Sequence, residues 1–270
     1  MTAVGADIKA LRTRIKSVDS TLHLTKAMGL VASSKIRGAT AAMNRCRDYS
    51  DAVTAIIESV SSSPECAKSP YMADNGTGRT KIIVIAGDRG LAGGYNANVF
   101  RLAATFPDAE FVPIGKRACE RYGAEFNSSE KYTGEQAYAL AKQLCKEFCG
   151  GEFDRLGIIG TKYVSMMKQD AFIEWVLPLQ KTEPKSGAST LFEPNERYIL
   201  DSAVPEYVTG VLLGAVRESY TCEVVARRMA MDSAGKNAQV MIDDLQLQYN
   251  RARQGAITQE ITEIIAGSGS

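Results

Sequence analysis

A glycine-rich loop at residues 87–96 has the spacing most suggestive of chemistry. The apolar run 81–86 precedes it and predicts a buried strand, and we expect a helix after it, from Ala97 to about Thr105. A strand, a glycine loop and a helix in this order form the phosphate sites of dinucleotide-binding proteins. The loop reads Gly87-Asp88-Arg89-Gly90-Leu91-Ala92-Gly93-Gly94-Tyr95-Asn96.

The spacing of these glycines argues against a nucleotide site. It is Gly-x-x-Gly-x-x-Gly instead of Gly-x-Gly-x-x-Gly, and no Gly-Lys-Ser/Thr sequence supplies a phosphate-binding lysine. We therefore favour a tight turn with close packing of helix on strand, and we expect no cofactor here. A free-standing α/β enzyme that binds a nucleotide at residues 86–96 is the alternative.

The other residues that could do chemistry form no catalytic set. His23 is the sole histidine, and neither a cysteine nor a second histidine stands at ligand spacing from it. The pairs Asp243-Asp244 and Glu260/Glu263 belong to an expected helix, where a solvated face explains them better than acid–base work. We predict no catalytic residue and no metal site.

The composition is that of a soluble globular protein, with 45% apolar and 23% charged residues and a net charge of +1 over 270 residues. No apolar run of 18 residues predicts a transmembrane helix, and the N-terminus lacks the apolar region of a secretion signal. Reduced, structural thiols in a cytoplasmic protein are the favoured interpretation of the cysteines, with a redox pair at Cys145 and Cys149 as the alternative. The six cysteines are at positions 46, 66, 119, 145, 149 and 222.

The prolines divide the chain into three parts. All eight lie between Pro64 and Pro205, so nothing in the first 63 or the last 65 residues forbids a long helix. We predict a helix over residues 1–63, an α/β domain over 64–205 and a second helix over 206–270, with Glu206 in its first turn.

The N-terminal helix is expected to end at residues 61–64, because a residue before proline is pushed out of the α region. A step of three and four residues from Ile8 to Val60 meets mostly apolar positions, which predicts a heptad seam. The face away from this seam is basic, and a solvated face, a docking stripe for an acidic partner and nucleic-acid binding are the alternatives. Between residues 8 and 47 its basic residues are Lys9, Arg12, Arg14, Lys16, Lys26, Lys35, Arg37, Arg45 and Arg47, against Asp19 alone.

The middle part alternates strand-like and helix-like segments, which indicates a small Rossmann-like α/β domain with a mostly parallel sheet. Strands are expected at 81–86, 111–115, 156–160 and 172–179, and residues 181–195 form a polar linker. The C-terminal helix has its own seam, so the two terminal helices are predicted to pair as a long antiparallel coiled coil. This second seam runs Met231, Gly235, Ala238, Ile242, Leu245, Tyr249, Ala252 and Ala256, after which the apolar phase moves to Ile257, Ile261 and Ile264.

Three stretches of the chain resemble the gamma subunit of the rotary F-type ATP synthase. They are Thr25–Met28 with Val31–Lys35, the glycine loop from Asp88 to Asn96, and a long C-terminal signature. The signature comprises Met231–Asn237, Leu245-x-Leu247-x-Tyr249-Asn250-Arg251-Ala252-Arg253-Gln254 and Ile257–Ile261. Ala92 departs from a position where the family often has cysteine, and His23 and Gly29 are unusual in the first helix. No cysteine-bearing insertion of the chloroplast type is present.

The resemblance implies a rotor shaft without catalytic residues, which transmits torque between the membrane ring of c subunits and the catalytic beta subunits. It implies alpha, beta and epsilon subunits and the c-ring as partners, with no nucleic acid and no direct membrane insertion. The expected location is the cytoplasmic face of the bacterial inner membrane, or the matrix side of the mitochondrial inner membrane. The resemblance leaves open the coupling ion, the size of the c-ring and whether the enzyme makes or hydrolyses ATP in the cell. A generic coiled-coil scaffold or nucleic-acid binder is the remaining rival.

The resemblance also implies subunit contacts at particular residues. A lower contact to acidic beta-subunit segments would use Lys26, Met28 and Arg228, and polar contacts to a beta-subunit loop would use Arg253, Gln254 and Thr258. An apolar sleeve around the tip would receive Ile257, Ile261 and Ile264.

Overall fold

The computed structural model describes residues 3–73, 76–181 and 192–268, and the chain divides into two compact units. Unit 1 comprises residues 1–32 with 228–270, and unit 2 comprises residues 33–227. The helix α1 (Ala3–Ser61) and the helix α5 (Glu196–Ser268) each contribute to both units. α1 ends at Ser61, three residues before Pro64, as predicted.

Unit 1 is an antiparallel pair of helices that pack through small residues. A Cβ added to Gly29 would lie 3.6 Å from Cβ of Met231, and one added to Gly235 would lie 3.6 Å from Oγ1 of Thr25. Leu22 packs further along, with Ala238 and Ile242. As the residue number falls along α1, the number of the contacting residue on α5 rises by a similar amount, which confirms the antiparallel seam. All seam positions of α1 from Ile8 to Val60 are buried or partly buried.

The last turns of α5 lie beyond this pairing. The contacts of Gly29 with Met231 and of Thr25 with Gly235 set a register that places Ala256 near residue 4, so Ile261 and Ile264 lie opposite no described residue of α1. Ile257, Ile261 and Ile264 are accordingly exposed. The apolar phase therefore changes close to the level at which the described part of α1 begins.

The predicted start of the C-terminal helix was wrong. α5 begins at Glu196 and contains Pro205 in its interior, so the helix starts ten residues before position 206. A proline inside a helix costs about 3 kcal/mol, chiefly through a lost hydrogen bond. Leu200, Val204 and Val208 are completely buried around it. Burial of each such side chain contributes roughly 1.5–3 kcal/mol, so tertiary packing outweighs the local penalty.

The sheet of unit 2 has the strand order β2-β1-β3-β4. The strands are β1 (Thr80–Ile85), β2 (Glu110–Ile114), β3 (Arg155–Tyr163) and β4 (Gln169–Leu177). β1 pairs in parallel with β2 and with β3, whereas β3 and β4 are antiparallel. The few residues between β3 and β4 are enough for a hairpin but too few for a crossover, and this pair is therefore antiparallel. The other pairs are parallel, so the sheet is mostly parallel, as predicted.

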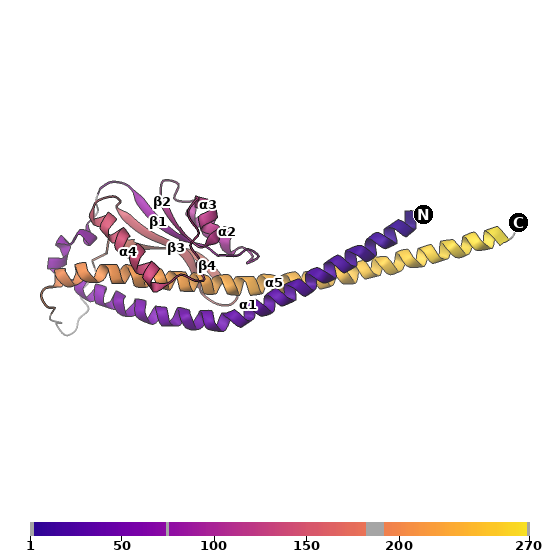
Figure 1. Ribbon diagram of the computed structural model, residues 1–270, viewed down its shortest axis with the longest axis horizontal. Coiled ribbons are helices and arrows are strands. Elements are labelled where there is room, and N and C mark those ends of the chain that lie inside the picture. Colours follow the sequence, from indigo (N-terminus) through magenta and orange to yellow (C-terminus); the bar gives the residue numbers. More distant parts are fainter. Residues whose placement is uncertain (1–2, 74–75, 182–191, 269–270) are drawn as a thin grey trace. The chain divides into compact units, whose positions relative to one another are not determined.

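Helices cover both faces of this sheet (Figure 1). α2 (Tyr95–Ala103) and α3 (Lys116–Tyr122) pack on one face, with Ile82, Val84 and Ile159. The other face contributes Ile83, Ile85 and Ile158 to a second core. That core is completed by α4 (Gly134–Cys149), by α5 from Leu200 to Val216 and by Ile57 and Val60 of α1. A parallel sheet must bury both faces, and here the long helices supply one cover.

By length and composition alone, α5 contains one stretch apolar enough to cross a membrane, among the residues that the structure describes. Half of that stretch is buried within the protein. A core helix of a soluble protein passes the same test, and the packing of α5 on the sheet accounts for its apolar character.

Gly115, between β2 and α3, allows the chain to pass close to the end of β1. Its φ is +93°, and an added Cβ would lie 1.9 Å from the carbonyl oxygen of Ala86.

We predict that Gly115→Ala lowers the free energy of unfolding by more than about 3 kcal/mol, because the backbone at Ala86 or at residue 115 must move to relieve the clash. Gly123 has a φ of +69° with open space around it. Gly123→Ala should therefore cost only about 1–2 kcal/mol of backbone strain. Chemical denaturation of the purified variants measures both, and equal losses would contradict the close approach.

Candidate functional site

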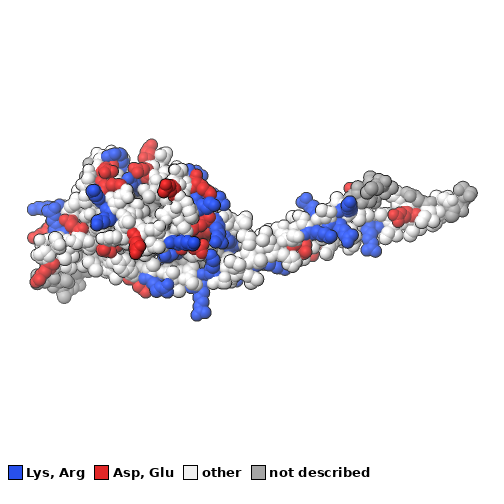
Figure 2. Space-filling model, in the orientation of Figure 1, with Lys and Arg blue, Asp and Glu red and all other residues white. Residues whose placement is uncertain are grey.

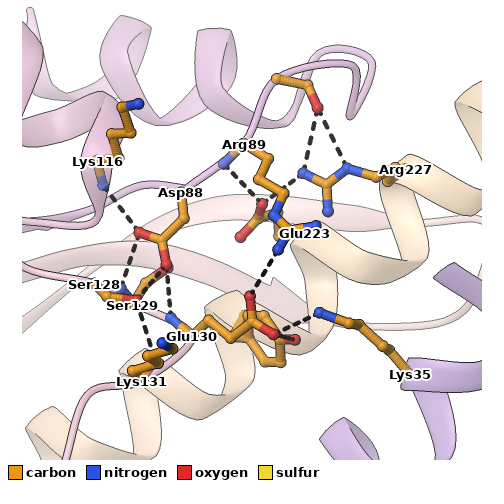
Figure 3. A network of polar contacts seen from close by, with 12 residues as sticks. Lys35, Asp88, Arg89, Lys116, Ser128, Ser129, Glu130, Lys131, Glu223 and Arg227 are labelled. Carbon is orange, nitrogen blue, oxygen red and sulfur yellow. Dashed lines mark hydrogen bonds and ion pairs between the residues drawn. The ribbon is translucent and has the colours of Figure 1, made fainter. Parts of the chain in front are cut away.

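The glycine loop lies at the C-terminal end of β1, and Asp88 ties it to two other segments (Figure 3). Its Oδ1 accepts hydrogen bonds of 3.0 Å from the backbone N–H groups of Lys116 and Ser129. Its Oδ2 accepts from the hydroxyl of Ser128 at 2.6 Å and from the backbone N–H of Glu130 at 3.0 Å. Burial alone would raise the pKa of Asp88, but these hydrogen bonds to the carboxylate outweigh it and lower the pKa.

A second carboxylate, that of Glu223 on α5, contacts the same loop. Glu223 is only 1% exposed, and its Oε1 accepts from the backbone N–H of Arg89 at 3.3 Å and from Arg227 at 2.5 Å. The same guanidinium donates to the carbonyl oxygen of Gly90 at 3.3 Å. A Cβ on Gly87 would lie 2.7 Å from Cδ of Glu223, so a larger residue at position 87 would displace this carboxylate from the loop.

These carboxylates give the loop a chemistry opposite to that of a phosphate site. In dinucleotide-binding folds the loop after the first strand presents free N–H groups to a pyrophosphate. Here the N–H of Arg89 is bound to Glu223, and the N–H of Gly87 is bound to Asn96 at 2.9 Å. A phosphate would also meet the negative charge of Glu223. The geometry therefore supports the interpretation of the loop as a tight packing turn.

Glu130 connects the segment after α3 to both long helices. Its carboxylate accepts from Lys35 of α1 at 2.5 Å and from the hydroxyl of Tyr220 of α5 at 3.0 Å. Arg89 forms an ion pair with it at 3.7 Å. Burial would raise the pKa of Glu130, but the hydrogen bonds from Lys35 and Tyr220 and the neighbouring positive charges lower it. Arg217 of α5 adds hydrogen bonds to the carbonyl oxygens of residues 130 and 132.

Helical periodicity explains why α5 can supply so many of these groups. Steps of three and four residues place Arg217, Tyr220, Glu223 and Arg227 on one face of the helix. Our sequence reasoning missed this set, together with Asp88 and Glu130. The available signal was the presence of charged residues within an otherwise apolar stretch of helix, which indicates buried pairing.

The nine predicted interface residues all belong to unit 1. Met28 is partly buried and the other eight are exposed. The helix register brings Lys26, Met28 and Arg228 to the same region of the pair, near Met231. The remaining six lie along α5, beginning about 40 Å beyond Arg228 at 1.5 Å per residue. They are Arg253, Gln254, Ile257, Thr258, Ile261 and Ile264.

The basic stripe of α1 is partly used inside unit 2. Lys35 pairs with Glu130, and Arg47 pairs with Glu218 at 3.2 Å. At these two positions the acidic partner is the chain's own carboxylate. Figure 2 shows positive and negative side chains intermixed over the α/β domain on the face drawn.

The remaining candidates for chemistry stay apart from one another. His23 is exposed and lies 3.8 Å from Asp19. Cys145 is buried, which raises the pKa of its thiol to about 12, while Cys149 is exposed and all six cysteines are free. Among the described residues no three His, Cys, Asp or Glu side chains form a group that could hold a metal.

The fold and the site together define a class: a protein built on a long antiparallel helix pair, whose α/β domain uses a nucleotide-type loop for internal docking. Comparison with known proteins agrees. Residues 7–270 match the family model described as ATP synthase. The ATP synthase gamma chain of Ruminococcus albus is 37% identical, covering 97% of this chain and 98% of that protein. The gamma chain of Geotalea uraniireducens is 34% identical over 98% of this chain and 99% of that protein. The chain therefore belongs to the family of ATP synthase gamma chains.

Solved structures share the fold. A chain of the Euglena gracilis mitochondrial ATP synthase, in a structure of its OSCP, F1 and c-ring, superposes with a TM-score of 0.66 at 16% identity. The alignment covers 98% of this chain and 94% of that one. The central stalk and c-ring structure from Tetrahymena thermophila gives a TM-score of 0.60 at 18% identity, covering 78% of this chain and 99% of that one.

The hydrogen bonds to Asp88 lead to a pH-dependent prediction. A lowered folded-state pKa means that the carboxylate stabilises the fold above its ordinary value of 3.8 and loses this contribution as the pH falls below it. Asp88→Asn should lower the free energy of unfolding by about 2 kcal/mol at pH 7, because the amide places donors against N–H groups. At pH 3 the difference from wild type should shrink.

Urea denaturation at the two pH values measures this effect, with Asp108→Asn as the control. Asp108 is an exposed aspartate of the same domain, and its replacement should change stability little at either pH. A loss for Asp88→Asn that is the same at pH 7 and pH 3 would contradict the role of the charge.

Proposed function

We infer that this chain is the rotor shaft of an F-type ATP synthase, a subunit of a membrane-associated complex. The observation that carries the inference is the similarity to ATP synthase gamma chains over nearly the whole length of both proteins. In this function the shaft transmits torque between the c-ring and the catalytic beta subunits. ATP is made or hydrolysed on the beta subunits, so the shaft has no catalytic residue of its own.

The structural properties of unit 1 suit a shaft. Two antiparallel helices that approach closely through Gly29, Gly235 and Ala238 bend less readily than one helix. α1 and α5 are continuous through both units, so a rotation applied to the helices of unit 2 is carried along the backbone into unit 1.

The exposed isoleucines at the end of α5 support a partner that covers them. Ile261 and Ile264 are 52% and 69% exposed. We propose that Ile257, Ile261 and Ile264 turn within an apolar sleeve of alpha and beta subunits. Exposed apolar side chains gathered at one site are typical of an interaction surface, and a sleeve without charges lets them slide.

Two groups of residues, both of which include an arginine, are proposed to contact the beta subunits. Arg253, Gln254 and Thr258 would bind a loop near the tip, and Lys26, Met28 and Arg228 would meet acidic segments lower on the shaft. Complementary charges of this kind fix orientation and accelerate association more than they add affinity.

The remaining partners and the location are also proposals. The α/β domain would lie beside the epsilon subunit and the c-ring, and the complex would be on the cytoplasmic face of the bacterial inner membrane. The bacterial gamma chains among the relatives favour this side over a mitochondrial location.

Reconstitution tests the function directly. Alpha and beta subunits from a bacterial relative, mixed with this chain, should form a complex with sustained ATPase activity. Omission of this chain should leave slow or no multi-site turnover. A chain that co-purifies with neither alpha nor beta subunits would refute the assignment.

The upper polar contact gives a sharper prediction. The double variant Arg253→Ala/Gln254→Ala should lower ATPase activity of the reconstituted complex about tenfold, since charged contacts at an interface cost about 1–3 kcal/mol when removed. The control is Gln248→Ala/Arg251→Ala, which changes the same residue types at exposed positions one turn earlier on α5. Equal activities for the two double variants would argue against the proposed contact.

A further inference from the structure

Two kinds of contact hold the α/β domain of unit 2 against the two long helices. One is the apolar core in which α5 covers the sheet. The other is a polar set that we call the coupling cluster, comprising Lys35, Arg89, Glu130, Arg217 and Tyr220. Figure 3 labels the first three of these residues. The two kinds of contact resist different movements.

The apolar core resists separation of the domain from the helices but resists sliding only weakly. The hydrophobic effect is non-directional and depends on the area removed from water, so a small shift that keeps the area buried costs little. Hydrogen bonds weaken steeply with angle and distance, and charged ones are the strongest. A load that twists the domain relative to the helices therefore falls first on polar contacts.

Glu130 is placed to carry such a load. Its backbone N–H is fixed to Asp88 of the glycine loop, and its backbone carbonyl accepts from Arg217 of α5. Its carboxylate reaches α1 through Lys35 and α5 through Tyr220 at the same time. One residue of the domain thus contacts both long helices, in two directions.

We propose that Glu130, through Lys35 and Tyr220, is the positioning residue that locks the α/β domain to the helix pair when torque passes between them. This rests on the proposed rotor function. The buried pair of Glu223 and Arg227 acts beside it as the fixed anchor of the glycine loop on α5. Glu130 and Lys35 are more exposed, about a third each.

The experiment uses the complete membrane-bound enzyme in inverted vesicles. Glu130→Gln keeps the size and an acceptor oxygen but loses the charge, and Lys35→Met removes one arm of the cluster. Lys35→Arg keeps the charge and should rescue. Lys142→Met replaces an exposed lysine of the same domain, on α4, and serves as the control.

Two activities are compared for each variant. The first is ATP hydrolysis by the enzyme detached from the membrane, in which the domain meets no resisting load. The second is the number of ions pumped per ATP as the opposing gradient rises. We expect hydrolysis to stay near the wild-type value, and pumping per ATP at high gradient to fall about two- to fivefold for Glu130→Gln and Lys35→Met. Lys35→Arg and Lys142→Met should pump as wild type.

Each other outcome overturns the proposal. Pumping at wild-type efficiency by Glu130→Gln and Lys35→Met would show that the coupling cluster carries no load. If Glu130→Gln fails to assemble, Lys35→Met decides, and normal pumping by it refutes the proposal. A fall in detached hydrolysis equal to the fall in pumping would indicate a general structural defect instead. If the unsubstituted chain does not restore the enzyme, the rotor function itself is wrong, and the coupling role falls with it.

Discussion

The burial of one face of the parallel sheet by α5 is the constraint on which the rest of unit 2 depends. β1 and β3 present alternate side chains to the two faces, and a parallel sheet leaves neither face to water. α2 and α3 cover one face from within the domain. The other face is covered by α4 and by α5, whose Leu200, Val204 and Val208 are fully buried there. The α/β domain is therefore built onto the helix, and a proline is tolerated within α5 because its neighbours complete this core.

Once α5 covers the sheet, polar groups at the strand ends must be satisfied from that helix. Glu223 is almost fully buried and needs the guanidinium of Arg227, because an unpaired buried carboxylate is strongly unfavourable. The loop that binds a pyrophosphate in dinucleotide folds binds this side chain here. The same strand–loop–helix topology thus binds a pyrophosphate in one fold and packs against a helix in another. The buried carboxylate of Glu223, rather than the glycines of the loop, distinguishes the two uses.

Unit 1 shows a different physical solution. Its two helices have no sheet to cover, so they bury a narrow seam on each other, and the seam contains small residues that allow close approach. Most of the remaining surface stays exposed, including the isoleucines beyond Ala256. In a rotor this combination has a function: the seam makes the pair stiff, and the exposed surface is available to the subunits through which it turns.

The sequence by itself determined the seams, the end of α1 and the mostly parallel sheet, because apolar periodicity and proline act over a few residues and are visible in one chain. It also identified the family, through the C-terminal signature. Only the tertiary structure decided the start of α5, since buried side chains around Pro205 outweigh a local rule that would end the helix. Tertiary structure alone also decided the partners of Asp88, Glu130 and Glu223. Each contacts residues far away in sequence, and the distance between a carboxylate and its donor depends on how the helices pack, which no local pattern records.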